Sequence, residues 1–275
     1  MDPRTIEITA ADGYVLTGTL YDAESNDALL VAPAMGVKRR FYDAFARHIA
    51  ERGRSVVTID YRGIGDSRPS SLRTFGGTMS DWGRLDIAAA IDWIGRELRP
   101  SSFAYAGHSA GGQLVGLAAN AERIDSMLLV CAQSGHWRHW PGVRAYGLGA
   151  LWLAMPLISR IVGFFPSKPL GLGSEDLPRG VASEWARFGR HPEYIFRDHD
   201  PAPYARLTAP ILAYSFCDDS YGPKSAVDWF VAKYSGAPVT RVHVDTPGLG
   251  HFGYFRRGKG EPYWDRAVAH FTRSG

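Results

Sequence analysis

The stretch YAGHSAGG at residues 105–112 decides the fold. Its five central residues, 107–111, fit the pattern G-x-S-x-G, in which a serine sits at a sharp turn from a strand into a helix. The apolar run SFAYAGH (102–108) predicts the strand, and AGGQLVGLAANA (110–121) predicts the helix. Glycines are expected at 107 and 111 because a β-carbon at either place would collide with its neighbours. Free backbone N–H groups at the start of the helix would point toward the serine oxygen.

Strands and helices alternate on both sides of this stretch. Strands alternating with helices of ten or more residues predict an α/β fold with a mostly parallel sheet that is covered on both faces. The first strands have no helix between them and should form an antiparallel edge. A dinucleotide-binding interpretation of GHSAGG fails because the spacing G-x-G-x-x-G is absent and the strand is not the first of its sheet. We expect strands over 5–10, 14–23, 28–34, 55–61, 102–108, 126–133, 209–216 and 240–246, and further helices over 41–52, 80–98 (capped by Ser80 and Asp81), 223–234 and 261–271.

Two later segments carry the residue types that would activate Ser109. A serine is a poor nucleophile until a base takes its proton, and that base needs a carboxylate to orient it. Asp218 and Asp219 follow an apolar strand, and His251 lies in a glycine-rich loop after the last strand. Spacing to Pro223 favours Asp219 as the acid over Asp218. The predicted catalytic residues are therefore Ser109, Asp219 and His251.

With these residues in order, the chain resembles the serine-hydrolase branch of the α/β-hydrolase superfamily, which includes esterases, lipases and S33-peptidase-like members. The resemblance is carried by DYRGIGDS (60–67), GHSAGG (107–112), DSYGP (219–223) and GLGHFG (248–253). It implies an α/β-hydrolase fold, a nucleophile elbow at Ser109, and structural roles for Asp60, Arg62 and Gly63.

The same resemblance places an oxyanion hole at the backbone N–H groups of Met35 and Ala110. The family usually carries His-Gly after its third strand. This chain has VAPAMGVKRRFY (31–42) there, so the loop departs from the family pattern. A backbone donor does not depend on its side chain, which makes methionine acceptable at this position.

The region 134–204 contains no segment in which a strand is predicted. The resemblance implies a helical cap here, inserted after the sixth core strand, with 1–133 and 205–275 forming the core. A loop of this length is uncommon unless it is functional. Its aromatic face either covers the sheet or also lines an apolar substrate pocket, for which the candidates are Trp137, Trp152 and Met155.

Composition limits the other function classes. The net charge is +3, from 31 Lys and Arg against 28 Asp and Glu, which is too small and scattered for nucleic-acid binding. Cys131 and Cys217 lie in apolar segments and are expected to be buried thiols. The first residues lack the apolar core of a signal peptide, so a cytoplasmic location is expected. The uncharged stretch 145–159 is too short for a transmembrane span and contains Pro156.

These features predict a serine hydrolase that cleaves an ester, thioester or related acyl bond of a small-molecule substrate, without cofactor or metal. His and Asp pairs at 136–139 and 197–200 are interpreted as surface or cap residues rather than metal ligands. Three alternatives stay open: an acyltransferase of the same fold, a hydrolase-like ligand-binding protein with little turnover, and an aminopeptidase. The substrate and the oligomeric state are left open.

Overall fold

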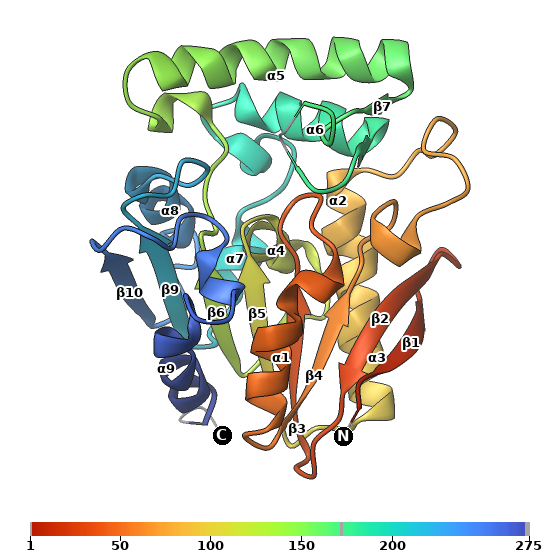
Figure 1. Ribbon diagram of the computed structural model, residues 1–275, viewed down its shortest axis with the longest axis vertical. Coiled ribbons are helices and arrows are strands. Elements are labelled where there is room, and N and C mark those ends of the chain that lie inside the picture. The colour runs from red at the N-terminus through yellow and green to blue at the C-terminus, as the bar shows by residue number, and fades with distance from the viewer. Residues whose placement is uncertain (1, 171–172, 273–275) are drawn as a thin grey trace.

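An eight-stranded sheet forms the centre of the molecule in this computed structural model, which describes residues 2–170 and 173–272 (Figure 1). The strand order is β1-β2-β4-β3-β5-β6-β9-β10. All pairs from β4 to β10 are parallel, whereas β1 pairs with β2 and β2 with β4 in antiparallel fashion. The expected parallel sheet with an antiparallel N-terminal edge is confirmed. The strands are β1 (Arg4–Thr9), β2 (Val15–Tyr21), β3 (Asp27–Ala32), β4 (Arg54–Ile59), β5 (Ser102–His108), β6 (Ser126–Val130), β9 (Ile211–Phe216) and β10 (Val239–Val244).

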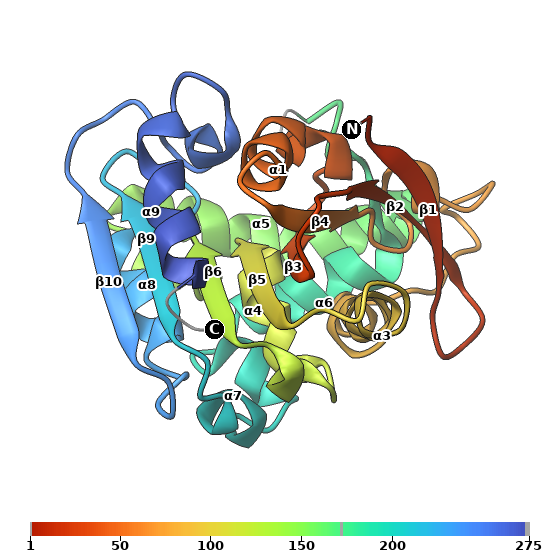
Figure 2. The ribbon, with the colours of Figure 1, turned by 90° about the horizontal axis from the view of Figure 1, so that it is seen from below.

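Helices cover both faces of this sheet, as Figure 2 shows from below. One face packs against α1 (Asp43–Ala50) and α9 (Glu261–Thr272), and the other against α3 (Ala88–Glu97), α4 (Ala110–Leu114) and α8 (Lys224–Val231). Every residue of β4, β5, β6 and β9 is buried. This double coverage explains why these strands are continuous apolar runs rather than alternating ones.

Two helices differ from the sequence-based expectation in their cap, their regularity or their length by more than a few terminal residues. The helix before the elbow begins at α2 (Met79–Asp81), capped by Thr78 rather than Ser80, and passes through a π-helical segment, η3 (Trp82–Ile87), into α3. The helix after Ser109 ends at Leu114 and continues only as the short 3-10 helix η4 (Val115–Leu117). Glycines weaken helices, and this segment holds three of them at 111, 112 and 116.

The chain between β6 and β9 rises over the carboxyl ends of the parallel strands (Figure 1). Its longest element, α5 (Val143–Val162), lies across the top of the molecule above α6 (Arg179–Gly189). A two-stranded sheet, β7 (Phe164–Phe165) and β8 (Leu177–Pro178), joins them; strands this short carry no readable periodicity in the sequence. The remaining short helices are η1 (Arg39–Tyr42), η2 (Gly65–Ser67), η5 (Ala121–Arg123), η6 (Trp137–His139), η7 (Tyr194–Arg197), α7 (Ala202–Arg206) and η8 (Gly253–Phe255).

Among the described residues, α5 is the one helix whose length and composition would suffice to cross a membrane. It has 20 residues, five more than the uncharged stretch 145–159, because Arg144 and Arg160 fall within its first and last turns. One side of α5 packs against α6 and buries Trp152 and Met155. The helix therefore belongs to the layer that covers the sheet.

The expectation for Cys217 is wrong: the residue is exposed, whereas Cys131 is buried as expected. Strand β9 ends at Phe216, so Cys217 already belongs to the turn that leaves the sheet. Its Sγ lies 3.1 Å from the carbonyl oxygen of Asp245.

Candidate active site

Ser109 stands between the end of β5 and the start of α4, with φ of 50° and ψ of −112°. A non-glycine residue rarely adopts this conformation, and the surrounding structure has to enforce it. Gly111 and Gly107 provide the space: a β-carbon on Gly111 would lie 2.2 Å from the carbonyl oxygen of Ala32, and one on Gly107 would lie 2.6 Å from the backbone of Gly112. The predicted reason for both glycines is confirmed.

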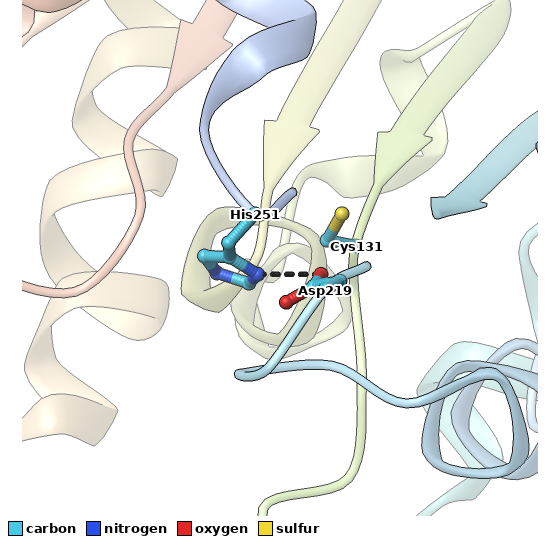
Figure 3. A group of neighbouring side chains, drawn as sticks. All are labelled: Cys131, Asp219 and His251. Carbon is cyan, nitrogen blue, oxygen red and sulfur yellow. Dashed lines mark hydrogen bonds and ion pairs between the residues drawn. The ribbon is translucent and has the colours of Figure 1, made fainter. Parts of the chain in front are cut away.

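His251 and Asp219 meet at the same edge of the sheet, after β10 and β9 respectively (Figure 3). His251 Nδ1 lies 2.8 Å from Asp219 Oδ2, and both side chains are buried. Asp219 Oδ1 accepts hydrogen bonds from the backbone N–H groups of Tyr221 (2.7 Å) and Gly222 (2.9 Å). Burial alone would raise the pKa of Asp219, but His251, the Cys131 thiol and the Tyr221 amide outweigh it and hold that pKa below its usual value. Asp219 therefore stays ionised.

Asp218 takes a different part in the same turn. Its carboxylate accepts hydrogen bonds from the backbone N–H groups of Gly248 (2.6 Å) and Gly250 (2.9 Å). It braces the loop that carries His251 and, among the described residues, forms no hydrogen bond with the imidazole ring. Of the two neighbouring acids, Asp219 is the one that meets His251.

Cys131 completes the group drawn in Figure 3, although no role in the site was predicted for it. It directly follows β6, has a positive φ of 54°, and places its thiol against Asp219. The ligand atoms of Cys131, Asp219 and His251 lie within 4.8 Å of one another, a spacing that also suits a metal ion. Burial and the adjacent carboxylate of Asp219 raise the pKa of the Cys131 thiol well above its ordinary value, which opposes the thiolate that a metal requires. The residues fit a hydrogen-bonded thiol better than a metal site.

Ser109 Oγ contacts the side chain of Gln133, which belongs to a polar network that was not predicted from the sequence. It lies 3.4 Å from both Oε1 and Nε2 of Gln133, whose Nε2 also donates to the carbonyl oxygen of Tyr221 (3.1 Å). Gln113 Nε2 donates to Gln133 Oε1 (3.2 Å), and Tyr194 donates to Gln113 Oε1 (2.9 Å). A chain of hydrogen bonds thus runs from η7, beneath the covering layer, to the serine.

The two backbone N–H groups expected to form an oxyanion hole lie in the turn after β3 and at the first residue of α4. Neither Met35 N nor Ala110 N has a hydrogen-bond partner among the described residues. Ala110 is at the helix start, where N–H groups have no partner within the helix. Both donors are therefore available to a ligand.

His108, the residue before Ser109, ties three loops of the site together. Its Nδ1 accepts from the Tyr42 hydroxyl (2.8 Å), which itself accepts from the N–H of Ala34, and its Nε2 donates to the carbonyl oxygen of His251 (2.8 Å). Complete burial, with His251 adding to it, lowers the pKa of His108 to about 3, so the ring is neutral and this tautomer follows from its partners. The sequence feature that could have pointed to this role is the position of His108 inside the G-x-S-x-G pattern.

A cavity of about 580 Å³ opens beside Ser109 and His251, which both line it. Trp152 and Met155 line it as predicted, but Trp137 does not. Trp137 lies in η6, where its ring packs 6.0 Å from that of Tyr146 on α5, and its neighbour Trp140 lines the cavity instead. The other large apolar contributors are Met35, Phe41, Leu148, Leu151, Phe165, Leu177, Trp185 and Phe252.

The segments predicted as structural contain buried ion pairs. Asp60 accepts from the backbone N–H of Arg39 (2.7 Å) and pairs with its guanidinium, while Arg62 pairs with Asp86 (2.6 Å) and Asp12 (2.6 Å). These contacts fix the turn after β4 and the loop after β3, in which Met35 lies.

Comparisons with known proteins agree with this architecture. The protein-family model described as "alpha/beta hydrolase fold" matches residues 28–156, and no curated protein sequence matches the chain. Similar solved structures include the esterase Pf2001 of Pyrococcus furiosus (15% identity, TM-score 0.67, covering 100% of this chain and 92% of that one). Mouse alpha/beta hydrolase domain-containing protein 10 gives 14% identity and a TM-score of 0.65, and the match covers 99% of this chain and 100% of that one. Est1E of Butyrivibrio proteoclasticus, solved with ferulic acid bound, gives 16% identity and a TM-score of 0.62, and the match covers 98% of each chain.

Proposed function

We propose that this chain, which has the α/β-hydrolase fold, is a serine hydrolase that cleaves an ester, thioester or related acyl bond. One arrangement carries the proposal. A strained serine at the turn from β5 into α4 and a hydrogen-bonded His251–Asp219 pair line or adjoin the same apolar cavity. The similar structures named as esterases support the ester class.

In the proposed first step, Ser109 Oγ attacks the carbonyl carbon of the acyl group. Its proton passes to Nε2 of His251, the ring nitrogen that does not face Asp219. Ser109 Oγ leaves Gln133 to make this contact, since catalytic hydrogen bonds often tighten only when substrate binds. The ionised Asp219 carboxylate orients the ring and stabilises the imidazolium that forms.

The negative charge that develops on the carbonyl oxygen then has to be stabilised by hydrogen-bond donors. The free N–H groups of Met35 and Ala110 are the proposed pair, as both lack a partner among the described residues. Loss of one such donor typically costs about 10²–10³-fold in kcat. His251 returns its proton to the leaving group, which leaves an acyl group on Ser109. Water, activated by the same imidazole, hydrolyses this acyl-enzyme.

A fluorophosphonate probe tests the assignment of the nucleophile. We expect the wild-type protein to be labelled at Ser109, and Ser109→Ala to lose both labelling and hydrolysis of p-nitrophenyl esters while its thermal unfolding is unchanged. Ser220, which also lines the cavity, provides the control, and Ser220→Ala should keep labelling. An adduct mapped to any serine other than Ser109 would contradict the proposal.

An acyltransferase of the same fold would use the same residues, with an alcohol or thiol in place of water. Adding a nucleophile to the ester assay and measuring how the product partitions distinguishes the two reactions. A ligand-binding protein would bind an ester beneath α5 with negligible turnover, which the same assay detects.

A further inference from the structure

The outer side of α5 is apolar and exposed along its whole length. Large side chains point outward at 143, 146, 153, 157 and 161, and exposed Ala150 fills the gap in this series. Residues three and four apart share one face of a helix, so they form a continuous stripe. These five side chains, with exposed fractions of 61–84%, are five of the nine large hydrophobic residues exposed in the described chain: Val143, Tyr146, Leu153, Leu157 and Ile161.

The inner side of the same helix is apolar as well, because Leu148, Leu151, Trp152 and Met155 line the cavity. A helix that is apolar all round is normally enclosed by protein or lipid. Yet only 22% of the most apolar 18-residue window of α5 is buried, and the helix lies at the top of the molecule, away from both termini (Figure 1). The outer stripe therefore lacks a covering layer in the described chain.

The charged residues in the chain segment that carries the stripe are all cations. No Asp or Glu occurs between residues 126 and 174, whereas Arg138, Arg144, Arg160 and Lys168 do, and all four are exposed. The three arginines form no ion pair among the described residues, and Arg73 adds a further cation over the ring of Phe164, just after α5. An apolar stripe flanked by unpaired cations complements an anionic lipid surface.

A second copy of the chain fits the stripe less well. A 20-residue helix is about 30 Å long and presents a face of about 300 Å², whereas a stable dimer buries about 800 Å² per partner. Two copies would also bring their arginines together. A spanning orientation would remove Trp152 from its contacts with Trp185 and with the carbonyl oxygen of Gly135.

We propose that the outer face of α5 docks this protein on an anionic membrane surface, with the helix lying in the plane of the interface. The docked side chains are the five of the stripe, and Arg138, Arg144 and Arg160 contact lipid phosphates. Arg144, Gly147 and Leu148 of α5 also line the cavity, so docking places its edge at the lipid surface. If the proposed hydrolase activity holds, its substrates include acyl esters that partition into lipid.

Vesicle flotation with the full-length protein tests this directly. We expect binding to phosphatidylcholine vesicles that contain about one third phosphatidylglycerol to be at least about tenfold tighter than to pure phosphatidylcholine, and to weaken in about 0.5 M NaCl. Leu153→Ser, Leu157→Ser and Ile161→Ser should each weaken binding by about tenfold. Arg144→Gln and Arg160→Gln should each weaken it by about fivefold.

Matched controls separate the stripe from general surface effects. Val15→Ser and Val239→Ser change exposed valines on β2 and β10, and Arg4→Gln changes an exposed arginine on β1, so these variants should bind as the wild type does. Ser109→Ala should also bind normally, which keeps this test independent of catalysis. Equal binding to neutral and anionic vesicles, or stripe variants that bind like the controls, would overturn the proposal. So would a dimer in solution that Leu153→Ser dissociates while vesicle binding is absent.

Discussion

Two neighbouring carboxylates at the end of β9 have separate tasks because a tight turn points them in different directions. Asp219 faces His251, and Asp218 faces the backbone of the loop that holds His251. The spacing to Pro223 favoured Asp219, and the hydrogen bonds agree with that choice.

Exchanging each carboxylate for an amide distinguishes these tasks. Asp219→Asn should lower kcat for an activated ester by about 10⁴-fold, because the amide neither fixes the tautomer of His251 nor stabilises its charged form. Asp218→Asn is the matched control and should keep most activity, since its amide oxygen still accepts from Gly248 and Gly250. A larger loss in Asp218→Asn than in Asp219→Asn would contradict the assignment.

His108 predicts a pH dependence of stability that is independent of catalysis. Its pKa is about 3 in the folded protein against 6.5 as its ordinary value, so between these limits the unfolded chain binds more protons. His108 therefore does not reduce the free energy of unfolding above about pH 6.5. Below that pH, it lowers the free energy of unfolding by up to about 1.4 kcal/mol per pH unit. Glutamine at this position can hydrogen-bond but does not titrate. His108→Gln should reduce the slope of unfolding free energy against pH by about one proton, measured with urea between about pH 6.5 and about pH 4.

Other histidines with lowered pKa values, such as His48 and His199, contribute to the slope of the wild-type protein. The difference between the wild type and His108→Gln removes these contributions because they are common to both. An unchanged slope would mean that His108 is protonated in the folded state at low pH.

At the scale of elements, the elbow between β5 and α4 depends on how closely α4 approaches β3. The β-carbon position of Gly111 is 2.2 Å from a backbone oxygen of β3, so no side-chain movement relieves the contact. Gly147 is also in a helix, α5, but has nothing within 4 Å of its β-carbon position.

These two glycines make a matched pair for a stability measurement. Gly111→Ala should destabilise the protein by about 1–3 kcal/mol or more, because α4 or β3 has to shift. Gly147→Ala should stabilise it by about 0.5–1 kcal/mol through the higher helix propensity of alanine. Urea unfolding of both variants checks the signs. Equal effects would show that α4 can move away from β3 at little cost.

At the scale of the whole molecule, the sequence predicted features that depend on local patterns. All eight strands of the main sheet were located because the central buried strands are apolar runs and the strands at or next to the edges, β1, β2 and β10, alternate apolar with polar residues, with turn-forming residues between them. Ser109, Asp219 and His251 were predicted as catalytic candidates because each follows a predicted strand.

What the sequence did not predict depends on contacts between distant segments. Gln133 contacts Ser109 and Tyr221, which are 24 and 88 residues away in the sequence. Cys131 and Asp219 follow different strands, β6 and β9, and meet only because these strands are neighbours in the sheet. Trp137 and Trp140 were indistinguishable because η6 and its flanks have no periodicity from which an inward face can be identified. Side chains on irregular segments are positioned by tertiary packing, which a single sequence does not display.

The cavity is formed jointly by the sheet edge and α5, and its apolar lining predicts a dependence on acyl length. Each methylene that enters it should contribute up to about 0.8 kcal/mol, or about fourfold in kcat/KM per carbon, from acetyl until the cavity ends. Trp152→Ala should shift this limit to longer chains, because the indole forms part of the wall and packs on Trp185.

A second, milder variant is needed because Trp152 is buried and its loss can unfold the layer. Leu148 is partly exposed, so Leu148→Ala provides that variant. A panel of p-nitrophenyl esters of increasing acyl length gives the profiles. If both variants stay folded and keep the wild-type profile, or if that profile is flat, the acyl group binds elsewhere and α5 serves only to cover the sheet.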